Sequence, residues 1–273
     1  MSFETGRVAK QANCAFLARH GDTVVLVTTV MSEKPREGMD FFPLLVDFEE
    51  RYYAAGKVPG GFIKREGRPS ETAILSSRVT DRSIRSLFPD WMRNDVHVVA
   101  TVMSVDQKNP ANILAVNGAS IALACSDIPW GGPIGAVRIG CIDGQLVVNP
   151  DEADMPRSTL DLTVAGHKGG ITMVESGAQE VSEELMVDAL QLASEAICKI
   201  VDFIEGVVAK VGKPKMQLLE PPSIPEIDEW MEKELDQEIR DAVQIHAKMP
   251  RAAAVAAAQP RAADQLADKY PSS

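Results

Sequence analysis

The feature that most constrains the fold is one apolar stripe along a predicted helix that spans residues 183–211. Apolar residues recur there at intervals of three and four, which places them on one face of a helix of about eight turns. Ser182 precedes the run as an N-cap, and Gly212 ends it. A stripe of this length indicates a helix that covers the rest of a folded domain. Its members are Leu185, Ala189, Leu192, Ala196, Ile200, Ile204, Val207 and Val211.

Strand signals precede this helix. Two apolar runs within residues 8–32 meet at His20-Gly21-Asp22, which indicates a hairpin with glycine at the tight point. Small and apolar residues at helical spacing over 109–129 suit a helix pressed tightly against a sheet. Together with the remaining segments they predict one α+β domain. Those segments are an extended run over 40–55, a buried strand over 95–105, a hairpin over 133–150 that turns at Asp143-Gly144, and a strand pair over 159–176 that turns at Lys168-Gly169-Gly170.

The composition changes from Met216 onward. A proline-rich linker comes first, residues 227–249 predict a highly charged helix, and residues 250–273 are rich in alanine. This tail has too little apolar surface to fold alone, so we expect that the chain stops early or that the tail packs against a partner. The sequence therefore predicts one domain over 1–215, followed over 216–273 by a linker and the start of a truncated helical domain.

Charge is distributed unevenly along the 273 residues. The formal net charge of −11 argues against indiscriminate nucleic-acid binding by the whole surface. Between Arg51 and Arg93, however, nine basic residues stand against four acidic ones, an excess of five positive charges. Four glycines and two prolines within residues 56–69 predict a mobile loop in the same segment. This segregation of charge predicts a local site for an anionic ligand.

The helix after this loop carries a row of arginines. Ser70 is its predicted N-cap, and the helix extends to about Leu87. Arg78, Arg82 and Arg85 share one face, and guanidinium groups in a row hold successive phosphates bidentately. The alternative is structural, because each arginine taken singly also suits an ion pair with an acid of the same protein. The shared face and the local charge excess favour a polyanion.

The loop supplies further candidates for this site. Arg68 lies just before the helix, whose free first-turn N–H groups also favour anions. Lys64 and Arg65 lie on the loop beside Phe62, whose ring suits stacking on an unpaired base. Because the positive charge extends over a loop and several helical turns, we expect a polyanion rather than a single small phosphate.

The sequence gives no signal for a metal centre, a membrane span or secretion. Its four cysteines and four histidines are dispersed, without the spacing of a metal site or a disulfide framework. No apolar run approaches the roughly 20 residues of a membrane helix. The N-terminal segment "MSFETGRVAK" has no apolar signal sequence. We therefore expect a cytoplasmic protein with reduced thiols.

Several blocks of this sequence resemble the first core of the polynucleotide phosphorylase (polyribonucleotide nucleotidyltransferase) family. The most specific block is "AAGKVPGGFIKREGRPSE". The similarity runs from about residue 3 to residue 215, and the tail is similar to the start of that family's all-helical linker. The other blocks are "ETGRVAKQANCAF", "DFFPLLVDFEERYY", "DRSIRSLFP", "NPANILAVNGASIALACSDIPWGGPIGAVRIG" and "LDLTVAGHKGGITMVES".

This resemblance implies a ribonuclease PH-like (ribosomal protein S5 domain 2-like) core with a C-terminal helical segment. It implies an enzyme that degrades single-stranded RNA from the 3′ end with inorganic phosphate and Mg²⁺ and releases nucleoside diphosphates. It also implies a homotrimeric ring that the RNA threads, with Phe62, Lys64 and Arg65 at the aperture. The family has two phenylalanines and two arginines in this loop, so Ile63 removes one ring while Lys64 keeps the charge. Neither DNA nor a membrane is an implied partner.

The same resemblance places catalysis outside this chain. Active cores carry a serine-rich phosphate pocket before the small-residue helix and paired aspartates before a late strand. Here the pocket segment is "QKNPANILAVNGAS", without a serine cluster, and the late strand offers only Asp161, which we interpret as structural. We expect no catalytic residue and no metal ligand in this chain, and we expect Mg²⁺ in a second core of the full-length protein. The family's additional first strand is expected to be reduced to Met1–Phe3.

Two other interpretations stay open at this point. A non-catalytic RNA-binding ring subunit of an exosome-like complex has the same basic loop without a second core. A stand-alone ribonuclease PH-type nuclease needs a phosphate pocket, which the sequence does not show. The full reading frame distinguishes the first from the enzyme, and nucleoside diphosphate release by the 273-residue chain tests the second.

Overall fold

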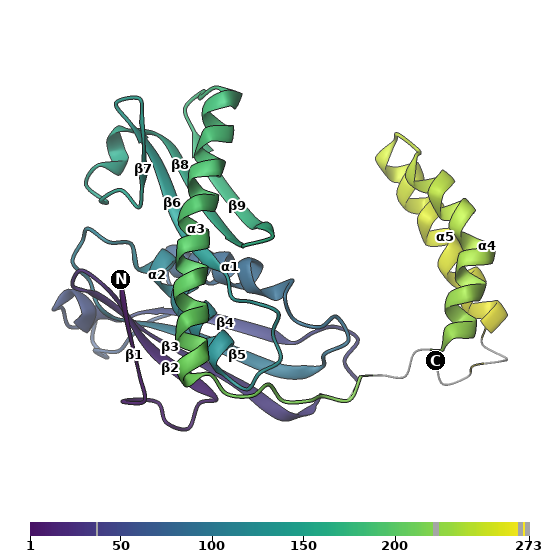
Figure 1. Ribbon diagram of the computed structural model, residues 1–273, viewed down its shortest axis with the longest axis horizontal. Helices are drawn as coiled ribbons and strands as arrows, with labels where there is room; N and C mark the ends of the chain where they lie inside the picture. The colour runs from purple at the N-terminus through teal and green to yellow at the C-terminus, as the bar shows by residue number, and fades with distance from the viewer. Residues whose placement is uncertain (37, 221–223, 267–269, 271–273) are drawn as a thin grey trace. The chain divides into compact units, whose positions relative to one another are not determined.

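A computed structural model describes residues 1–36, 38–220, 224–266 and 270 of the chain. It divides into two compact units, Met1–Leu219 and Glu220–Ser273. Among the described residues, the first unit contains two β-sheets and three α-helices, and the second contains a pair of helices (Figure 1). The mixture of helices and sheets in the first unit confirms the predicted α+β class.

The first sheet has five strands in the order β1-β2-β3-β5-β4. Along β3, buried residues such as Val25 and Val27 alternate with partly exposed ones, so that one face of the sheet covers the core. β4 runs parallel to β5, and the helix α1 forms the crossover between them. The elements are β1 (Ser2–Thr5), β2 (Cys14–His20), β3 (Thr23–Pro35), β4 (Leu44–Glu50), α1 (Glu71–Arg85) and β5 (Asn94–Ser104).

The second sheet is antiparallel, with four strands in the order β7-β6-β8-β9. The long helix α3 (Glu183–Val211) packs one apolar face along β6 and β8, as expected. Of the predicted stripe, Ala189 and Ile204 are fully buried, whereas Val211 is exposed. Ala189, Ala193 and Ile197 are among its fully buried residues. The strands are β6 (Gly135–Ile142), β7 (Gln145–Val148), β8 (Ser158–His167) and β9 (Gly170–Ala178), with a short 3-10 helix η2 (Met155–Arg157) between β7 and β8.

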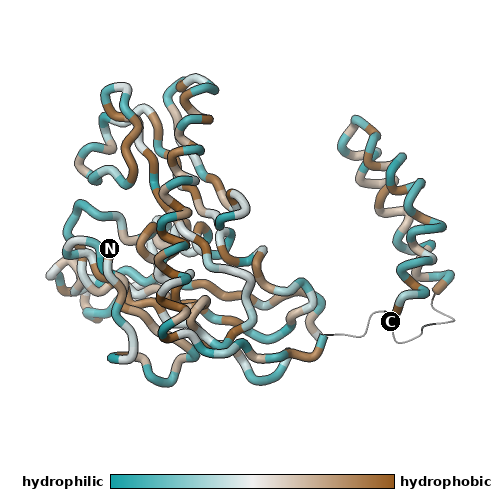
Figure 2. Tube along the Cα trace, in the orientation of Figure 1, coloured by the Kyte–Doolittle hydropathy of each residue, from teal (hydrophilic) through white to brown (hydrophobic). Residues whose placement is uncertain are grey.

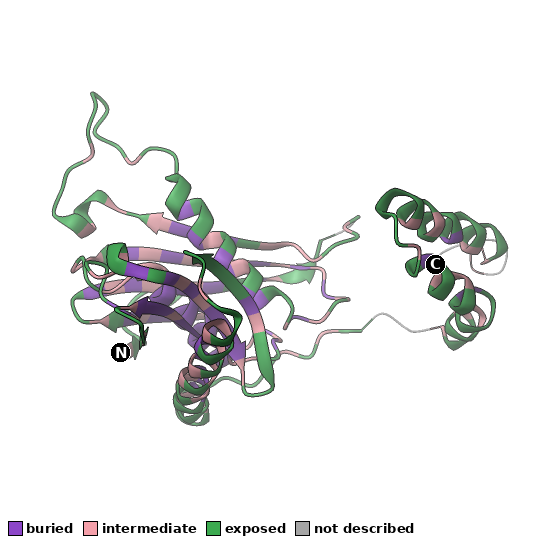
Figure 3. Ribbon diagram, turned by 90° about the horizontal axis from the view of Figure 1, so that it is seen from above, coloured by how far each residue is buried: buried purple, intermediate pink, exposed green. Residues whose placement is uncertain are grey.

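The helix α2 (Ala111–Cys125) is the centre of the first unit. Of its 15 residues, 13 are buried, because it contacts β2, β3 and β5 of one sheet as well as β6 of the other. The burial colours of Figure 3 show this inner region, where buried segments are concentrated away from the exposed loops. Small residues such as Ala115, Gly118 and Ala119 allow the close approach that the sequence pattern predicts.

The second unit consists of α4 (Pro225–Val243) and α5 (Lys248–Leu266), which pack against each other. Hydrophilic and apolar residues are mixed along its helices in Figure 2, and only Leu235, Ala242 and Ala258 are buried within them. This small apolar contact agrees with the limited core expected from the composition. No described helix in either unit is both long enough and apolar enough to cross a membrane.

Local sequence signals locate most element ends. Ser70 Oγ accepts a hydrogen bond from Ala73 N–H at 3.0 Å, and Ser182 Oγ accepts one from Leu185 N–H at 3.2 Å, so both predicted N-caps are confirmed. The extended run predicted over 40–55 is wrong at its end, where residues Tyr52–Ala55 form a 3-10 helix, η1. Gly56 closes that turn with a left-handed φ of 66° and donates its N–H to it. Helix α1 ends at Arg85, two residues before the predicted end.

Candidate functional site

The loop over residues 56–69 presents its side chains to solvent. The Phe62 side chain is fully exposed, and its neighbour Ile63 is 72% exposed. Lys64 has a left-handed φ of 54°, a conformation that non-glycine residues adopt in tight turns. Lys64 and Arg65 are exposed and make no ion pair or hydrogen bond with any other described residue. The loop therefore offers one aromatic ring and two unpaired cations together.

A groove of about 410 Å³ lies between the end of β4 and the start of α1. Its acids are engaged: Glu49 pairs with Arg51, Glu50 accepts from Ser70 Oγ at 2.6 Å, and Glu66 accepts from Tyr52 N–H at 3.0 Å. Within the described part of the chain, its cations Lys57 and Arg68 have no such partner. The groove keeps positive charge available beside the exposed loop. Its lining residues are Phe48, Glu49, Glu50, Arg51, Tyr52, Ala55, Lys57, Glu66, Gly67, Arg68, Pro69, Ser70 and Ala73.

The three arginines of α1 divide into two kinds. Arg85 donates to both carboxylate oxygens of Asp81, at 2.7 and 2.6 Å, and these hydrogen bonds raise the pKa of its guanidinium. Arg82 forms an ion pair with Glu175 of β9. Arg78 is exposed and, among the described residues, has no ion-pair partner. Arg82 and Arg85 thus form ion pairs within the protein, as the alternative interpretation of these arginines holds, whereas Arg78 remains available to a ligand.

A second polar region precedes α2, where the Asp106 carboxylate is surrounded by donors. The backbone N–H groups of Asp22, Lys108 and Asn109 donate to it at 3.0, 2.9 and 2.9 Å. Asn109 Nδ2 and Thr23 Oγ1 donate to it as well, at 2.6 and 3.0 Å. Burial alone raises the pKa of Asp106, but the hydrogen bonds from Asn109, Lys108 and Asp22 outweigh it and lower the pKa far below its ordinary value. Because these N–H groups already donate to the Asp106 carboxylate, they are not free to bind an external anion.

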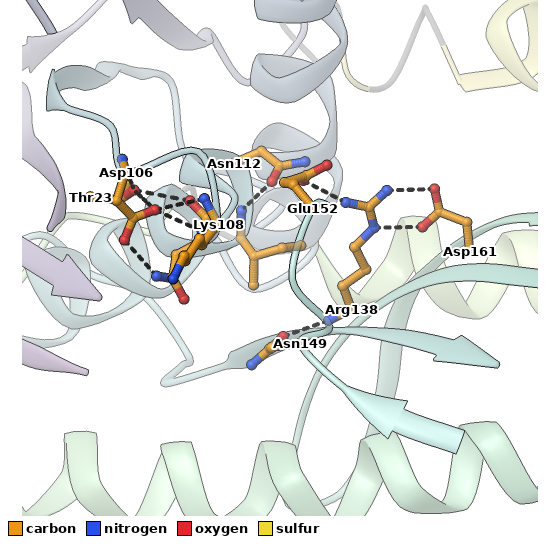
Figure 4. A network of polar contacts seen from close by, with 10 residues as sticks. Thr23, Asp106, Lys108, Asn112, Arg138, Asn149, Glu152 and Asp161 are labelled. Atoms are coloured by element: carbon orange, nitrogen blue, oxygen red, sulfur yellow. Dashed lines mark hydrogen bonds and ion pairs between the residues drawn. The ribbon is translucent and has the colours of Figure 1, made fainter. Parts of the chain in front are cut away.

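The late strand brings a pair of acids to one arginine (Figure 4). Asp161 of β8 accepts two hydrogen bonds from the guanidinium of Arg138, both at 2.7 Å. Glu152, on the loop after β7, accepts a third at 2.8 Å. The expectation of a structural Asp161 agrees with this ion pair. The late strand itself carries Asp161 as its one acid, as the sequence indicates, and folding brings Glu152 from the loop after β7 to the same guanidinium.

These residues do not form a metal site. Within the described residues no group of three or more histidine, cysteine or acidic side chains converges as metal ligands would. Asp161 and Glu152 both form ion pairs with Arg138, and Asp106 is saturated by hydrogen bonds from the protein. All four cysteines are free thiols, and burial raises the pKa of Cys125 to about 11.

Sequence reasoning missed Asp106, Arg138 and Glu152. Asp106 precedes Asn109 and Pro110 at a helix start, which is a side-chain turn signal. Arg138 stands inside the apolar strand "GAVRIGCI", and a charge in such a strand indicates a buried partner. Glu152 has no local signal, because its partner lies 14 residues away across a turn.

The two sheets, the helix α2 that contacts both of them and the exposed basic loop define a core of the ribonuclease PH class. The 3′ exoribonuclease family matches the chain in both of its parts, domain 1 over residues 1–129 and domain 2 over residues 132–196. The chain belongs to this family, and the resemblance inferred from its motifs is confirmed.

Curated relatives agree with this assignment. A polyribonucleotide nucleotidyltransferase from Halothermothrix orenii is 51% identical over 255 residues, which cover 93% of this chain and 36% of that protein. One from Caldicellulosiruptor saccharolyticus is 58% identical over 217 residues, covering 80% of this chain and 31% of that protein. The chain thus spans about a third of the length of these relatives. Rice Rrp46 shares the fold, with a TM-score of 0.60 at 16% identity over 76% of this chain and 93% of that chain.

Proposed function

We propose that this chain is the RNA-capturing first core of a polyribonucleotide nucleotidyltransferase, an enzyme that degrades RNA from its 3′ end by phosphorolysis. In this proposal residues 1–215 form the first ribonuclease PH-like domain, and residues 216–273 begin the all-helical linker domain. The chain itself carries no catalytic residue. Its task is to bind single-stranded RNA and guide it toward a second core.

The observation that carries this proposal is the exposed, unpaired charge of the 56–69 loop. Phe62 offers a free ring for stacking, and Lys64 and Arg65 offer cations that no described acid neutralises. Arg68 and Arg78 extend the same charge onto the groove and α1. Arg82 and Arg85 contribute less, because each already pairs with a carboxylate. A flexible polyanion with exposed bases fits such a surface better than a compact phosphate does.

Phosphate and Mg²⁺ belong to the second core in this proposal. The residues here do not fit Mg²⁺, because a guanidinium already lies between Asp161 and Glu152. The greater length of the curated relatives supports the presence of a second core in the full-length protein. We also propose a homotrimeric ring and, in keeping with four free thiols, a cytoplasmic location. RNA is the expected partner, in preference to DNA or a membrane.

The relatives also distinguish this function from an RNA-binding ring subunit of an exosome-like complex. Proteins 51% and 58% identical to this chain are named polyribonucleotide nucleotidyltransferases, which favours the enzyme. The likeness to rice Rrp46, at 16% identity, concerns the fold alone.

The test is RNA binding by the 273-residue chain with a fluorescent single-stranded RNA at several salt concentrations. Lys64→Ala/Arg65→Ala is expected to weaken binding and to lower the slope of log K against log salt by about 0.7 for each phosphate that these cations no longer neutralise. Lys199→Ala/Lys210→Ala is the matched control, since it removes two exposed cations from α3, far from the loop in sequence. Equal effects of the two double variants, or an unchanged salt slope in the first, contradict the proposed capture role.

A second measurement tests whether this core or the rest of the full-length protein carries out phosphorolysis. The 273-residue chain is expected to release no nucleoside diphosphate from RNA with phosphate and Mg²⁺, whereas the full-length protein is expected to do so. Release by the 273-residue chain would place catalysis in this core and support a stand-alone nuclease instead.

A further inference from the structure

The side chains of Arg138, Asp161 and Glu152 are held together by three separate parts of the fold. Arg138 and Asp161 lie on the neighbouring antiparallel strands β6 and β8, where Thr163 is opposite Arg138 and Asp161 is two residues along on the same face. Glu152 comes from the loop between β7 and η2, and its own N–H donates to Lys108 O at 3.1 Å. The cluster therefore joins both family-matched halves of the first unit.

The guanidinium between these acids is the most buried member of the cluster. The Arg138 side chain is 14% exposed, against 43% for Glu152 and 47% for Asp161. Its three nitrogen atoms each donate to a carboxylate oxygen, at 2.7, 2.7 and 2.8 Å. One positive charge thus lies between two negative charges, with the acids on its outer side.

Two carboxylates that converge on one small volume are the oxygen donors that hard divalent cations such as Mg²⁺ and Mn²⁺ prefer. A cation between them stabilises both in the ionised form, because two carboxylates brought together without one repel each other. We propose that the guanidinium of Arg138 takes the place of a divalent cation between Asp161 and Glu152 and keeps these two carboxylates from binding a metal ion.

The permanence of this charge distinguishes the guanidinium from a metal ion. An arginine stays protonated at all physiological pH values, and its hydrogen bonds to Asp161 raise the pKa of Arg138 further. Unlike a bound ion, it does not exchange with solvent or respond to a chelator. The loop that carries Glu152 is therefore held without any requirement for metal.

The backbone of Arg138 adds to the same restraint. Asn149 N–H donates to Arg138 O at 2.7 Å, and Arg138 N–H donates to Asn149 Oδ1 at 2.9 Å. Arg138 therefore holds the loop after β7 at two points, Asn149 and Glu152. Substitutions of its side chain keep the backbone groups that make these two hydrogen bonds, so Asn149 is expected to stay bound to β6 while the charge is changed.

The experiment is titration of the 273-residue chain with Mn²⁺, followed by the electron paramagnetic resonance signal of free Mn²⁺ and by calorimetry. Arg138→Met removes the cation but keeps an apolar chain of similar length, and it is expected to bind one Mn²⁺ at least about tenfold more tightly than the native chain, because the uncompensated ligand charge rises. Its melting temperature is expected to rise with Mn²⁺, whereas that of the native chain is not.

Three variants serve as controls. Arg138→Lys keeps a positive charge and is expected to gain no Mn²⁺ binding. Arg138→Met/Asp161→Asn lacks one carboxylate and is expected to lose the gained site. Arg157→Met removes an arginine that also bridges two acids, Asp143 and Asp154, but at an exposed position, and is expected to behave as the native chain does.

Each outcome decides the proposal. If folded Arg138→Met binds Mn²⁺ no better than Arg157→Met, or if the double variant keeps the gained site, the guanidinium does not substitute for a cation. If Arg138→Met unfolds without metal, recovery of its circular dichroism spectrum with Mn²⁺, but not with Na⁺ of equal ionic strength, supports the proposal. Absence of that recovery overturns it.

Discussion

The side-chain amide of Asn117 makes both backbone hydrogen bonds of Ala136. Asn117 Nδ2 donates to Ala136 O at 2.9 Å, and Asn117 Oδ1 accepts from Ala136 N–H at 2.8 Å. Ser120, one turn further along α2, does the same for Ile134, with distances of 2.6 and 2.9 Å. The buried helix α2 thus satisfies the backbone at the start of β6 as a neighbouring strand would.

Asn117→Ala is expected to lower the free energy of unfolding by about 3 kcal/mol, because it leaves one buried N–H and one buried carbonyl of Ala136 without partners. Urea denaturation of the 273-residue chain measures this change. Asn112→Ala is the matched control at the first turn of the same helix, where the side chain accepts, among the described residues, only from Ile113 N–H. We expect the control to cost less than about 1 kcal/mol. If both variants lowered the free energy of unfolding by similar amounts, the hydrogen bonds between Asn117 and Ala136 would not be an important contribution to stability.

Two helical glycines are expected to respond to alanine in opposite directions. A Cβ at Gly118 of α2 would lie 2.7 Å from Val27 Cγ2 and 3.5 Å from Ala18 Cβ, inside the packed core. Even with the gain of about 1 kcal/mol in helix propensity, Gly118→Ala is expected to destabilise the fold by about 1–2 kcal/mol. A Cβ at Gly206 of α3 meets nothing within 4 Å, so Gly206→Ala is expected to stabilise it by about 0.5–1 kcal/mol. Thermal or urea unfolding of both variants checks the signs.

Arg78 and Arg82 allow a paired and an unpaired arginine of one helix to be compared. Arg78→Ala is expected to weaken single-stranded RNA binding and to reduce the salt slope by about 0.7, since Arg78 is free to contact a phosphate. Arg82→Ala breaks the pair with Glu175 and is expected to change stability by no more than about 1 kcal/mol, with a smaller effect on the slope. A salt slope reduced as much by Arg82→Ala as by Arg78→Ala would contradict this division.

Asp106 is expected to give the fold a dependence on acidic pH. Its pKa is depressed in the folded chain, so its stabilisation is present above the ordinary carboxyl pKa of about 3.9 and is lost as the pH falls below that value. Asp106→Asn is therefore expected to lower stability by about 2 kcal/mol at pH 7 and to differ progressively less from the native chain below pH ~4. Urea midpoints between pH 3 and pH 7 measure this difference, with Asp143→Asn in an exposed turn as the control. A difference that stays constant across this range would exclude the carboxylate as its source.

Local signals were sufficient for the framework of the fold. The serines at 70 and 182 cap their helices as their sequence context predicts, and the Asp143-Gly144 turn joins β6 to β7. Each of these features depends on residues within a few positions of one another. For the same reason the exposed loop and its cations were identified from the glycines, prolines and basic residues alone.

Contacts between residues far apart in the sequence could not be predicted from these local signals. Arg82 meets Glu175 across 93 residues, and Arg138 meets Asp161 across 23, so neither partner follows from local spacing. The parallel pairing of β4 with β5 likewise depends on how α1 crosses the sheet. The resemblance to a family indicated where to look for an acid pair, but only the folded chain shows that an arginine lies between the two acids.

The position of α2 also has a consequence for how the two family-matched segments can be inherited. The boundary between them, near residues 129–132, follows directly on a helix that belongs to the first segment yet is packed against β6 of the second. Recombination at that boundary between distant relatives would place α2 of one protein against β6 of another. The side chains of the two elements would then not have evolved to pack against each other. The two halves are therefore expected to be inherited together, even though each half matches its own domain of the family.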